Sequence, residues 1–382
     1  MLIVKKFGGT SVGNRDRIFN VANRCIEDYK KGHDIIVVLS AMGDTTDELI
    51  EKAHDINPNA SKREMDMLLT TGEQISVALM AMAINSLGVP AVSLNAFQVS
   101  MHTTATYSNA KFKRIDSERI RTELENRKIV IVTGFQGVNK FDDYTTLGRG
   151  GSDTTAVALA ASLHADMCEI YTDVEGVYTA DPRVVPNAKK LSEITYDEML
   201  ELATLGAKVL HNRSVEMAKK YDVQLVVRSS LSEAEGTVVK EVAKVESMLV
   251  SGVAADKNTA RIAVMGLKDE PGIAFKIFNL LAKSKINVDI ILQSIGRDGT
   301  KDISFTVAED DLKETLEILN SNKDKITAQK IESDDTVAKV SIVGAGMMTH
   351  SGVAAKMFEA LYNVGVNTVS YTHLTLPTNR EV

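Results

Sequence analysis

Five short segments of the sequence contain residue types that suit phosphate and carboxylate chemistry. The first, Lys6 to Ser11, reads Lys-Phe-Gly-Gly-Thr-Ser and follows an apolar strand pattern. Gly8 and Gly9 allow backbone N–H groups to approach an anion closely, and a helix beyond them would present its positive end. Lys6, at the end of the strand, suits charge stabilisation on a transferring phosphoryl group. Taken alone, this segment leaves phosphate binding and an ordinary strand-to-helix turn both open.

Two further segments combine hydroxyl, amide and carboxylate groups. Ser40 to Thr46 directly follows an apolar strand run, and ligands of open α/β sheets gather at the carboxyl ends of strands. Phosphate, a small polar substrate or a capped turn would each suit it. Thr70 to Gln74 opens a Met-rich helix pattern, in which Thr71 and Gln74 form a predicted capping box. Glu73 either favours that helix N-terminus or accepts a substrate ammonium group.

The fourth segment, Leu147 to Thr155, is the most informative. Three glycines surround Arg149 immediately before the apolar helix pattern Ala156–Leu163. The planar guanidinium of Arg149 suits a carboxylate or phosphate, and the helix N-terminus adds backbone donors. Ser152 or Asp153 can cap the helix, but capping explains neither the glycines nor the arginine. The segment therefore predicts an anion site.

The fifth segment, Thr172 to Arg183, again follows a strand pattern. Tyr178 suits contact with a nucleotide base and Asp173 suits a ribose or metal, although a long polar loop with two turns is the alternative. Two better-known phosphate signatures are absent. The sequence has no G-x-x-x-x-G-K-[S/T], and Gly344-Ala345-Gly346 has Thr349 where a dinucleotide fingerprint needs its third glycine. Ser/His/Asp, Cys/His and zinc-ligand patterns are absent too.

The segments need a scaffold, and the pattern of apolar runs indicates one. Near-continuous apolar strands that alternate with helices predict an α/β fold with a mostly parallel sheet, sandwiched by helices. The predicted strands are 2–4, 34–39, 91–94, 128–133, 167–172 and 224–227. The predicted helices are 15–30, 72–86, 117–126, 154–163 and 196–219.

Bulk properties limit the class of protein. A chain of 382 residues suggests two or three domains. The formal net charge of -7 argues against nucleic-acid binding, and the absence of a Lys/Arg run argues against a membrane-facing patch. The N-terminus reads as a strand without a signal-peptide pattern, so we expect the cytoplasm. Cys25 and Cys168 share no metal-ligand spacing and are expected to be buried.

The texture of the sequence changes after Arg228, and the remaining residues contain an internal repeat. Arg261–Gly266 is echoed by Lys339–Gly344, and Gly272–Leu281 by Gly352–Leu361, at an offset of roughly 80 residues. Two tandem β-turn-α-β units are therefore predicted. The second stops resembling the first near residue 370, so its tail reads as foreign or prematurely ended. The predicted division is a catalytic domain (1–230), a linker (231–255), a first repeat (256–333) and an incomplete second repeat (334–382).

The five segments in this order resemble the aspartate kinase (aspartokinase) family of the amino-acid kinase fold, over roughly residues 1–369. The matching motifs are K-F-G-G-T-S, S-A-M-G-D-T-T-D, T-G-E, G-R-G-G-S-D-T-T-A and T-D-V-E-G-V-Y-T-A-D-P-R. The resemblance implies transfer of a phosphoryl group from ATP, with Mg²⁺, to the side-chain carboxylate of L-aspartate. The product would be 4-phospho-L-aspartate, at the first step of lysine, threonine and methionine synthesis.

The resemblance also implies roles for individual residues. Lys6 and Asp153 would be catalytic, with Asp153 near the transferring phosphoryl group and its magnesium, and no separate protein metal site is expected. ATP would be bound by Lys6, Phe7, Gly8, Gly9, Ser40, Thr172, Asp173, Tyr178 and Arg183. Aspartate would be bound by Thr46, Glu73, Arg149, Gly150, Gly151 and Ser152.

The implied chemistry agrees with the residue inventory. The acceptor carboxylate is already ionised at pH 7, so no general base is required and none is evident. Catalysis would consist of positioning and charge neutralisation by Lys6, Mg²⁺ and backbone donors. Arg149 would clamp the α-carboxylate of aspartate while Glu73 accepts its ammonium group.

The repeats resemble tandem ACT domains, which in this family bind an end-product amino acid such as lysine or threonine. The effector's α-carboxylate would fit the helix N-terminus beyond Gly272, and Asp269 would accept its ammonium group. Because ACT units usually pair edge to edge across subunits, a homo-oligomer is implied, although missing strands of the second repeat would leave an exposed edge. The implied effector-binding residues are Asp269, Ile273, Ala274, Asp289 and Gln293.

Two other functions are compatible with parts of the sequence. Another amino-acid kinase, acting on glutamate, acetylglutamate or a nucleotide monophosphate, is disfavoured by Glu73, Arg149 and the ACT pair. A catalytically weak, effector-binding protein is disfavoured by the intact Lys6, Arg149 and Asp153.

Overall fold

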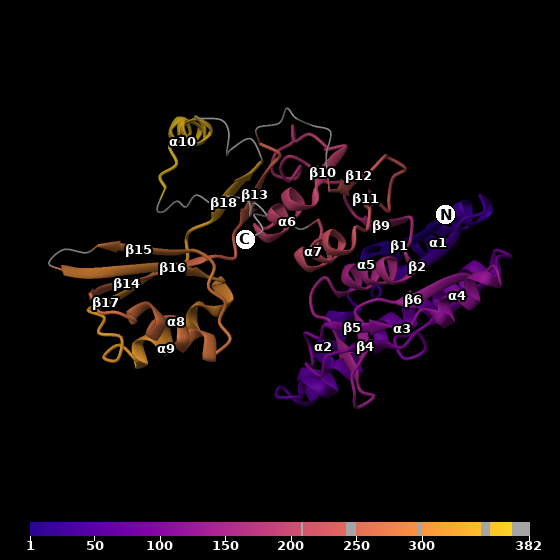
Figure 1. Ribbon diagram of the computed structural model, residues 1–382, viewed down its shortest axis with the longest axis horizontal. Coiled ribbons are helices and arrows are strands. Elements are labelled where there is room, and N and C mark those ends of the chain that lie inside the picture. The colour runs from indigo at the N-terminus through magenta and orange to yellow at the C-terminus, as the bar shows by residue number, and fades with distance from the viewer. Residues whose placement is uncertain (208, 242–249, 296–298, 345–351, 369–382) are drawn as a thin grey trace, which may run out of the picture. The chain divides into compact units, whose positions relative to one another are not determined.

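The computed structural model describes residues 1–207, 209–241, 250–295, 299–344 and 352–368. Within them the chain forms two compact units (Figure 1). The first comprises residues 1–252 with a returning segment that begins at Val343, and the second begins at Val253. Each unit has its own hydrophobic core.

An eight-stranded sheet lies at the centre of the first unit, with the order β10-β12-β11-β9-β1-β2-β6-β3. Neighbouring strands pair in parallel except β11 and β12, as the alternation of strands and helices predicted. The strands are rich in Val and Ile because both faces of such a sheet are covered. They are β1 (Leu2–Phe7), β2 (Asp34–Leu39), β3 (Ala91–Leu94), β6 (Ile129–Thr133), β9 (Met167–Thr172), β10 (Glu193–Thr195), β11 (Leu225–Ser229) and β12 (Thr237–Lys240).

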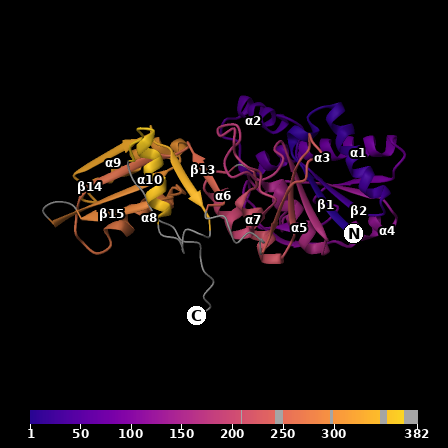
Figure 2. The same cartoon turned by 90° about the horizontal axis from the view of Figure 1, so that it is seen from above.

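Helices lie on both sides of this sheet (Figure 2). α1 (Arg15–Lys30) and α3 (Lys62–Ser86) pack on the face that contains Ile3 and Ile35. α5 (Gly151–Leu163), buried on nearly all sides, contacts β1, β2 and β9. The other helices of this unit are α2 (Thr45–Ile56), α4 (Glu118–Glu125), α6 (Tyr196–Thr204) and α7 (Asn212–Tyr221).

A smaller sheet, with the order β5-β4-β7-β8, leads into α5. Its last strand ends immediately before Leu147, so this sheet determines where the predicted glycine loop begins. The strands are β4 (Met101–Thr103), β5 (Phe112–Ile115), β7 (Gln136–Val138) and β8 (Tyr144–Thr146).

The second unit contains an antiparallel sheet with the order β15-β16-β14-β17. α8 (Ile273–Lys283) and α9 (Leu312–Ser321) pack against it through a core that includes Ile262, Ile277 and Phe305. This is the α+β arrangement expected of the first repeat. The strands are β14 (Ala260–Lys268), β15 (Ile291–Ile295), β16 (Thr300–Val307) and β17 (Lys330–Asp334).

The second repeat shares its sheet with a strand from before the first repeat. It contains β18 (Lys339–Val343) and α10 (Val353–Asn363), which match the repeat pattern. β18 pairs with β13 (Gly252–Asp256). The first repeat therefore lies in the sequence between β13 and β18, the two strands of this sheet.

The expected linker, residues 231–255, is structured at both ends. Thr237–Lys240 forms β12 of the central sheet, and β13 begins at Gly252. The small polar residues before β12 connect it to its antiparallel partner β11, and Ser229 and Ser230 at the start of this connection are buried. The predicted atypical tail, from about residue 370, lies outside the described residues.

The predicted start of the Met-rich helix was wrong. α3 begins at Lys62, where Ser61 is the N-cap and its hydroxyl accepts a hydrogen bond from Glu64 N. Thr71 consequently lies inside the helix, and its hydroxyl donates to the carbonyl of Leu68. The predicted capping box at Thr71 does not form.

The helix predicted over residues 196–219 is two helices. α6 ends at Thr204 and α7 begins at Asn212. Gly206, with φ at 113°, lies between them in a backbone conformation that interrupts a helix. The new helix start places His211 and Arg213 at the N-terminus of α7, beside α5.

One described helix, α3, is long and apolar enough to span a membrane by length and composition. However, 56% of its most apolar window is buried inside the protein. Its residues Val77, Met80 and Ile84 belong to the core of the first unit, which accounts for its composition.

Candidate functional site

The carboxyl ends of four neighbouring parallel strands meet at one edge of the central sheet. β9, β1, β2 and β6 are adjacent and point the same way. Three of the predicted segments follow β1, β2 and β9, and α5 packs against the same strands. The sheet thus gathers loops that are far apart in the sequence.

Two consecutive lysines of β1 point to opposite faces, because side chains alternate along a strand. Lys5 is fully buried, and its Nζ lies 2.5 Å from Asp28 and 3.0 Å from Glu169. Lys6 Nζ lies 2.6 Å from Oδ1 of Asp153, in the first turn of α5. Lys5 therefore belongs to the core, whereas Lys6 contacts the other residue predicted to be catalytic.

The capping role considered for the start of α5 was wrong. The N-cap is Gly150, in the left-handed conformation, and no side chain caps the helix. Ser152 Oγ instead accepts a hydrogen bond from Ser40 Oγ at 3.0 Å. Asp153 contacts Lys6, so the side chains of Ser152 and Asp153 face the loops after β2 and β1, respectively.

The loops after β1 and β2 approach each other too closely for larger residues. A Cβ at Gly9 would lie 2.5 Å from the carbonyl oxygen of Ala41. A Cβ at Gly72 would lie 2.9 Å from Ala41 Cβ, which lets α3 approach the same loop. A Cβ at Gly8 would lie 3.7 Å from Lys6 Nζ. Gly9 and Gly72 thus allow close packing of the two loops and α3, and the backbone of Gly8 and Gly9 lies beside Lys6, as a phosphate site requires.

Glu73 is buried where α3 passes this loop. Its Oε1 accepts a hydrogen bond from Ala41 N at 3.1 Å, whereas Oε2 has no hydrogen-bond partner among the described residues. Burial raises the pKa of Glu73 to about 8, outweighing the Ala41 N–H that lowers it. An incoming ammonium group would satisfy the free oxygen and favour the ionised carboxylate.

The glycine loop presents Arg149 to solvent. Gly148 and Gly150 on either side have φ angles of 79° and 68°, which favour glycine. A Cβ at Gly150 would also collide with the ring of His211. Gly151 packs against Phe135 and begins α5. The Arg149 side chain is exposed and has no hydrogen bond or ion pair within the described part of the chain.

The residues predicted for the nucleotide lie in the loop after β9, but their contacts are local. Thr172 Oγ1 accepts a hydrogen bond from Val174 N at 2.9 Å. The Arg183 guanidinium donates two hydrogen bonds to Asp181, at 3.0 and 2.8 Å, and its backbone N–H donates a third at 2.9 Å. Asp173 is exposed, and Tyr178 forms an isolated bridge with Lys190.

Phe7 and Thr46 were also predicted as site residues, and their surroundings differ from those of Lys6 and Ser40. The Phe7 side chain is buried and stacks on Tyr171 with ring centroids 4.4 Å apart, and its carbonyl accepts a hydrogen bond from Ser40 N at 3.2 Å. Thr46 is half-buried in the first turn of α2, after the loop that contains Ser40.

Sequence reasoning overlooked the loop after β6. A Cβ at Gly134 would lie 2.5 Å from Ser152 Oγ, and Phe135 has a φ of 67°. Phe135 N donates to Thr155 Oγ1 at 3.2 Å, and its carbonyl accepts from Leu147 N at 2.9 Å. A glycine directly after the apolar run Ile129–Val132 and Thr133 was the available signal.

The carboxylates of the site suit a Mg²⁺ ion that is bound together with a nucleotide. Among the described residues, no group of three or more His, Cys, Asp or Glu side chains could hold a metal ion. Mg²⁺ is usually bound by one or two carboxylates together with substrate phosphates. Asp153 beside the glycines of the first loop fits a Mg²⁺ ion that arrives with a nucleotide.

In the second unit, both predicted effector carboxylates are exposed and already paired. Asp269 lies 2.5 Å from Lys301 Nζ, and Asp289 pairs with Lys339. An effector's ammonium group would therefore compete with a lysine at either position.

The other predicted effector residues lie on two elements of that unit. Ile273 and Ala274 form the first turn of α8, after Gly272 with its φ of 89°. The Ile273 side chain is buried in the core, and its backbone N–H donates to the carbonyl of Glu270 at 3.4 Å, so a ligand would have to replace that bond. Gln293 is exposed on β15, an edge strand.

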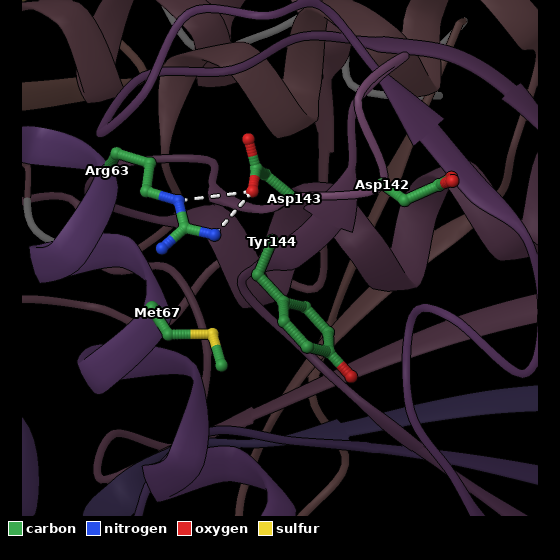
Figure 3. A pocket seen from close by; sticks show the side chains of 5 residues that line it. All are labelled: Arg63, Met67, Asp142, Asp143 and Tyr144. Atoms are coloured by element: carbon green, nitrogen blue, oxygen red, sulfur yellow. Dashed lines mark hydrogen bonds and ion pairs between the residues drawn. The ribbon is translucent and has the colours of Figure 1, made fainter.

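Figure 3 shows a pocket of the first unit outside the predicted site, lined by Arg63, Met67, Asp142, Asp143 and Tyr144. The Arg63 guanidinium donates two hydrogen bonds to Asp143 Oδ1, at 3.1 and 2.7 Å. This partly exposed pair links the first turn of α3 to the start of β8. None of the predicted site residues lines the pocket.

Sequence profiles of two families match the chain. That of the amino acid kinase family matches residues 1–229. That of the ACT domain matches residues 262–322 and 340–373. Together they cover the catalytic unit and both repeats.

Similar full-length proteins share one description. The aspartokinase of Bacillus sp. (strain MGA3) is 52% identical over 380 residues, covering 99% of this chain and 92% of the relative. The aspartokinase of Corynebacterium glutamicum is 52% identical over 372 residues, covering 96% of this chain and 88% of the relative.

Solved structures agree with these relatives. E. coli aspartokinase III in complex with aspartate and ADP has a TM-score of 0.80 at 27% identity, covering 95% of this chain and 92% of that one. Aspartate kinase from Synechocystis has a TM-score of 0.58 at 45% identity, covering 95% of this chain and 64% of that one. With half of its residues shared over nearly its whole length, this chain belongs to the aspartokinase family, within the amino acid kinase family.

Proposed function

We propose that this chain transfers the γ-phosphoryl group of ATP to the side-chain carboxylate of L-aspartate, producing 4-phospho-L-aspartate. The relatives are aspartokinases, and the similar E. coli enzyme was solved with aspartate and ADP. In this chain the proposal rests chiefly on the 2.6 Å contact of Lys6 with Asp153, at an edge that also holds the buried Glu73.

The reaction needs charge stabilisation more than proton transfer. The aspartate side chain is ionised at pH 7 and attacks the γ-phosphorus directly, while the bond to the β-phosphate oxygen breaks and ADP leaves. Lys6 stabilises the negative charge on the transferring group, and Asp153 holds its ammonium in place. Asp153 would hold a Mg²⁺ ion that arrives with the nucleotide, and this ion would supply positive charge to neutralise the phosphates.

Aspartate is recognised by groups of opposite charge. Glu73 accepts its ammonium group through the free Oε2, and Arg149 binds its α-carboxylate through the two-pronged guanidinium. Thr46 and Ser152 supply hydroxyls near the reacting carboxylate. The backbone N–H of Gly150 completes this side of the site, whereas Gly151 N donates to the carbonyl of Gly148 at 3.0 Å and Gly151 contributes by starting α5.

ATP lies across the edge of the sheet. Backbone N–H groups from Phe7 to Gly9, with the hydroxyl of Ser40, bind the phosphates. The adenosine side is formed by the loop after β9, with Thr172, Asp173, Tyr178 and Arg183.

The second unit regulates the first. The similar E. coli aspartokinase III was also solved with lysine and aspartate in its T-state, with a TM-score of 0.75 at 27% identity. Lysine is therefore the first proposed effector, and threonine, another end product, is the second. We also propose that the chain forms homo-oligomers through its ACT units and acts in the cytoplasm. We place the end of the catalytic sheet at Lys240, since β12 belongs to that sheet.

The test is acceptor-dependent ADP release, measured by a coupled assay with Mg-ATP and either aspartate or glutamate. Aspartate should give turnover at millimolar concentration, and glutamate should give at least about tenfold less, because an extra methylene displaces the reacting carboxylate. Equal rates, or a preference for glutamate, would assign the chain to another acceptor.

A further inference from the structure

Two chain segments meet at the base of the glycine loop. Ala110 N donates to the carbonyl of Thr146 at 2.9 Å, which joins the β4–β5 connection to the end of β8. Leu147 comes directly after, and Arg149 lies only two residues further on. Whatever holds these two segments therefore sets the position of Arg149.

A carboxylate from α3 holds one side of this base. Asp66 is fully buried, and its Oδ2 accepts hydrogen bonds from Ser108 N and Thr146 N, both at 2.9 Å. Its Oδ1 accepts from the hydroxyl of Thr146 at 2.8 Å. A buried carboxylate bound by several N–H and O–H donors is rigidly placed.

A guanidinium from α7 holds the other side. Arg213 is half-buried, and it donates to the carbonyls of Leu147 at 2.9 Å and Ala110 at 2.6 Å. Asp66 thus binds N–H groups and Arg213 binds carbonyl groups of the same two segments. The base of the loop is fixed by opposite charges from two helices.

Besides Asp66 and Arg213, the carbonyl of Phe135 holds the main chain of this loop, accepting from Leu147 N at 2.9 Å. The position of Arg149 depends on this support. Its side chain is exposed and unpaired within the described residues, and its neighbours are glycines without side chains. The position of the main chain at Leu147 therefore determines where the Arg149 guanidinium lies.

The same helix also holds Glu73. Asp66 and Glu73 are seven residues apart in α3, which is two turns, so they lie on one face of the helix. One rigid element thus anchors the loop of the proposed carboxylate clamp and presents the proposed ammonium acceptor. The distance between Arg149 and Glu73 determines the length of the amino acid that fits between them.

We propose that Asp66 and Arg213 are positioning residues for substrate recognition: they act through the main chain of Leu147 to hold Arg149 at a fixed distance from Glu73. The inference rests on the proposed function, since the ligand is aspartate. Neither residue contacts the substrate, so neither is catalytic.

The test is a kinetic cycle on the full chain with the coupled ADP assay. Arg213→Ala should raise KM for aspartate about tenfold while KM for ATP changes less than twofold, because a small misplacement of a binding group is costly. In an Arg149→Ala background the same substitution should have no further effect on KM for aspartate, since Arg149 mediates its action. Millimolar guanidinium should partly restore Arg213→Ala.

Conservative variants and a control complete the design. Arg213→Lys and Asp66→Asn, which keep part of the hydrogen bonding, should show smaller increases in the same direction and serve if Arg213→Ala does not fold. Arg63→Ala, which removes the exposed pair with Asp143 between α3 and the start of β8, should leave both KM values unchanged.

The outcomes separate the two proposals. Wild-type protein without aspartate-dependent ADP release would overturn the proposed function and this inference with it. Active wild type in which Arg213→Ala raises KM for aspartate equally with and without Arg149 would overturn the inference alone. So would a lowered Tm of Arg213→Ala and Arg213→Lys with unchanged KM values.

Discussion

The kinase site and the proposed effector site differ in how their polar side chains are partnered. In the first unit, contacts such as Lys6–Asp153 and Ser40–Ser152 join different loops and are largely shielded from water. In the second unit, Asp269 and Asp289 are exposed and pair with lysines. The first site is preformed by the fold of one chain. In the second site, a ligand must displace the lysines that already pair with Asp269 and Asp289.

This difference indicates where substitutions should matter. A preformed, shielded cluster acts through placement, so removing one member should reduce rate or affinity strongly. Exposed ion pairs contribute little and exchange readily, so removing one should alter regulation with little effect on turnover.

The largest expected effect is on Lys6. Lys6→Met should lower kcat about a thousandfold, because the charge that stabilises the transferring group is lost. The coupled ADP assay measures kcat, and circular dichroism measures Tm.

Lys5→Met is the matched control for Lys6. It leaves Asp28 and Glu169 without their buried partner, so Tm should fall further than in Lys6→Met while kcat falls far less. A Lys6→Met variant with wild-type kcat would remove Lys6 from catalysis.

The second effect is on Glu73. Glu73→Gln should raise KM for aspartate about a hundredfold, since a charged hydrogen bond to the ammonium group is lost. In the wild type, kcat/KM for aspartate should rise with pH up to about 8, where the raised pKa of Glu73 lies, because only the ionised carboxylate accepts ammonium. A pH profile with the same rise in Glu73→Gln would assign it to another group.

Thermal stability should respond to Glu73 in the opposite direction. A carboxyl group whose pKa is raised by folding contributes stability that is complete below its unfolded value of 4.5 and is lost as pH rises through about 8. Wild-type Tm should therefore fall more between pH 5 and 8 than Tm of Glu73→Gln. Parallel curves would contradict the buried environment of this side chain.

The third effect is on Arg149. Arg149→Lys should raise KM for aspartate about tenfold, because a lysine cannot make the two-pronged contact with a carboxylate. Tm should not change, since the side chain is exposed and unpaired among the described residues. Unchanged kinetics would exclude Arg149 from substrate binding.

The smallest effect is expected in the second unit. Asp269→Asn should raise the lysine concentration for half-inhibition about threefold, as expected of an exposed charge, without altering kcat. Glu332→Gln, which removes another exposed carboxylate paired with a lysine of the same unit, is the control and should alter neither quantity. A large fall in kcat for Asp269→Asn would contradict the division of roles between the two units.

The predictable part of the fold was the part with local signals. α1, β2, β3 and β9 have the predicted bounds, because apolar periodicity and strand length are readable from neighbouring residues. The start of α3 was misread because Thr71 and Gln74 imitate a capping box inside a longer helix. β12 was missed because the polar segment before it reads as a domain boundary, and β13 was missed because its pairing partner, β18, lies beyond the whole first repeat.

The candidate site was predictable to a similar extent. Residue type and position at a strand end pointed to Lys6 and to the hydroxyl of Ser40, whereas the role of Asp153 came only from the resemblance to the family. Asp66 and Arg213 bind main-chain groups of distant segments, and no local motif accompanies such contacts. Asp66 and Arg213 can therefore be identified only from the contacts that they make in the folded protein.

The most direct test of the central claim is to trap the product with hydroxylamine. An acyl phosphate on aspartate should give a coloured hydroxamate in amounts equal to the ADP released, in the wild type and not in Lys6→Met. ADP release without hydroxamate would mean that a carboxylate is not the acceptor, and would contradict the account of this site.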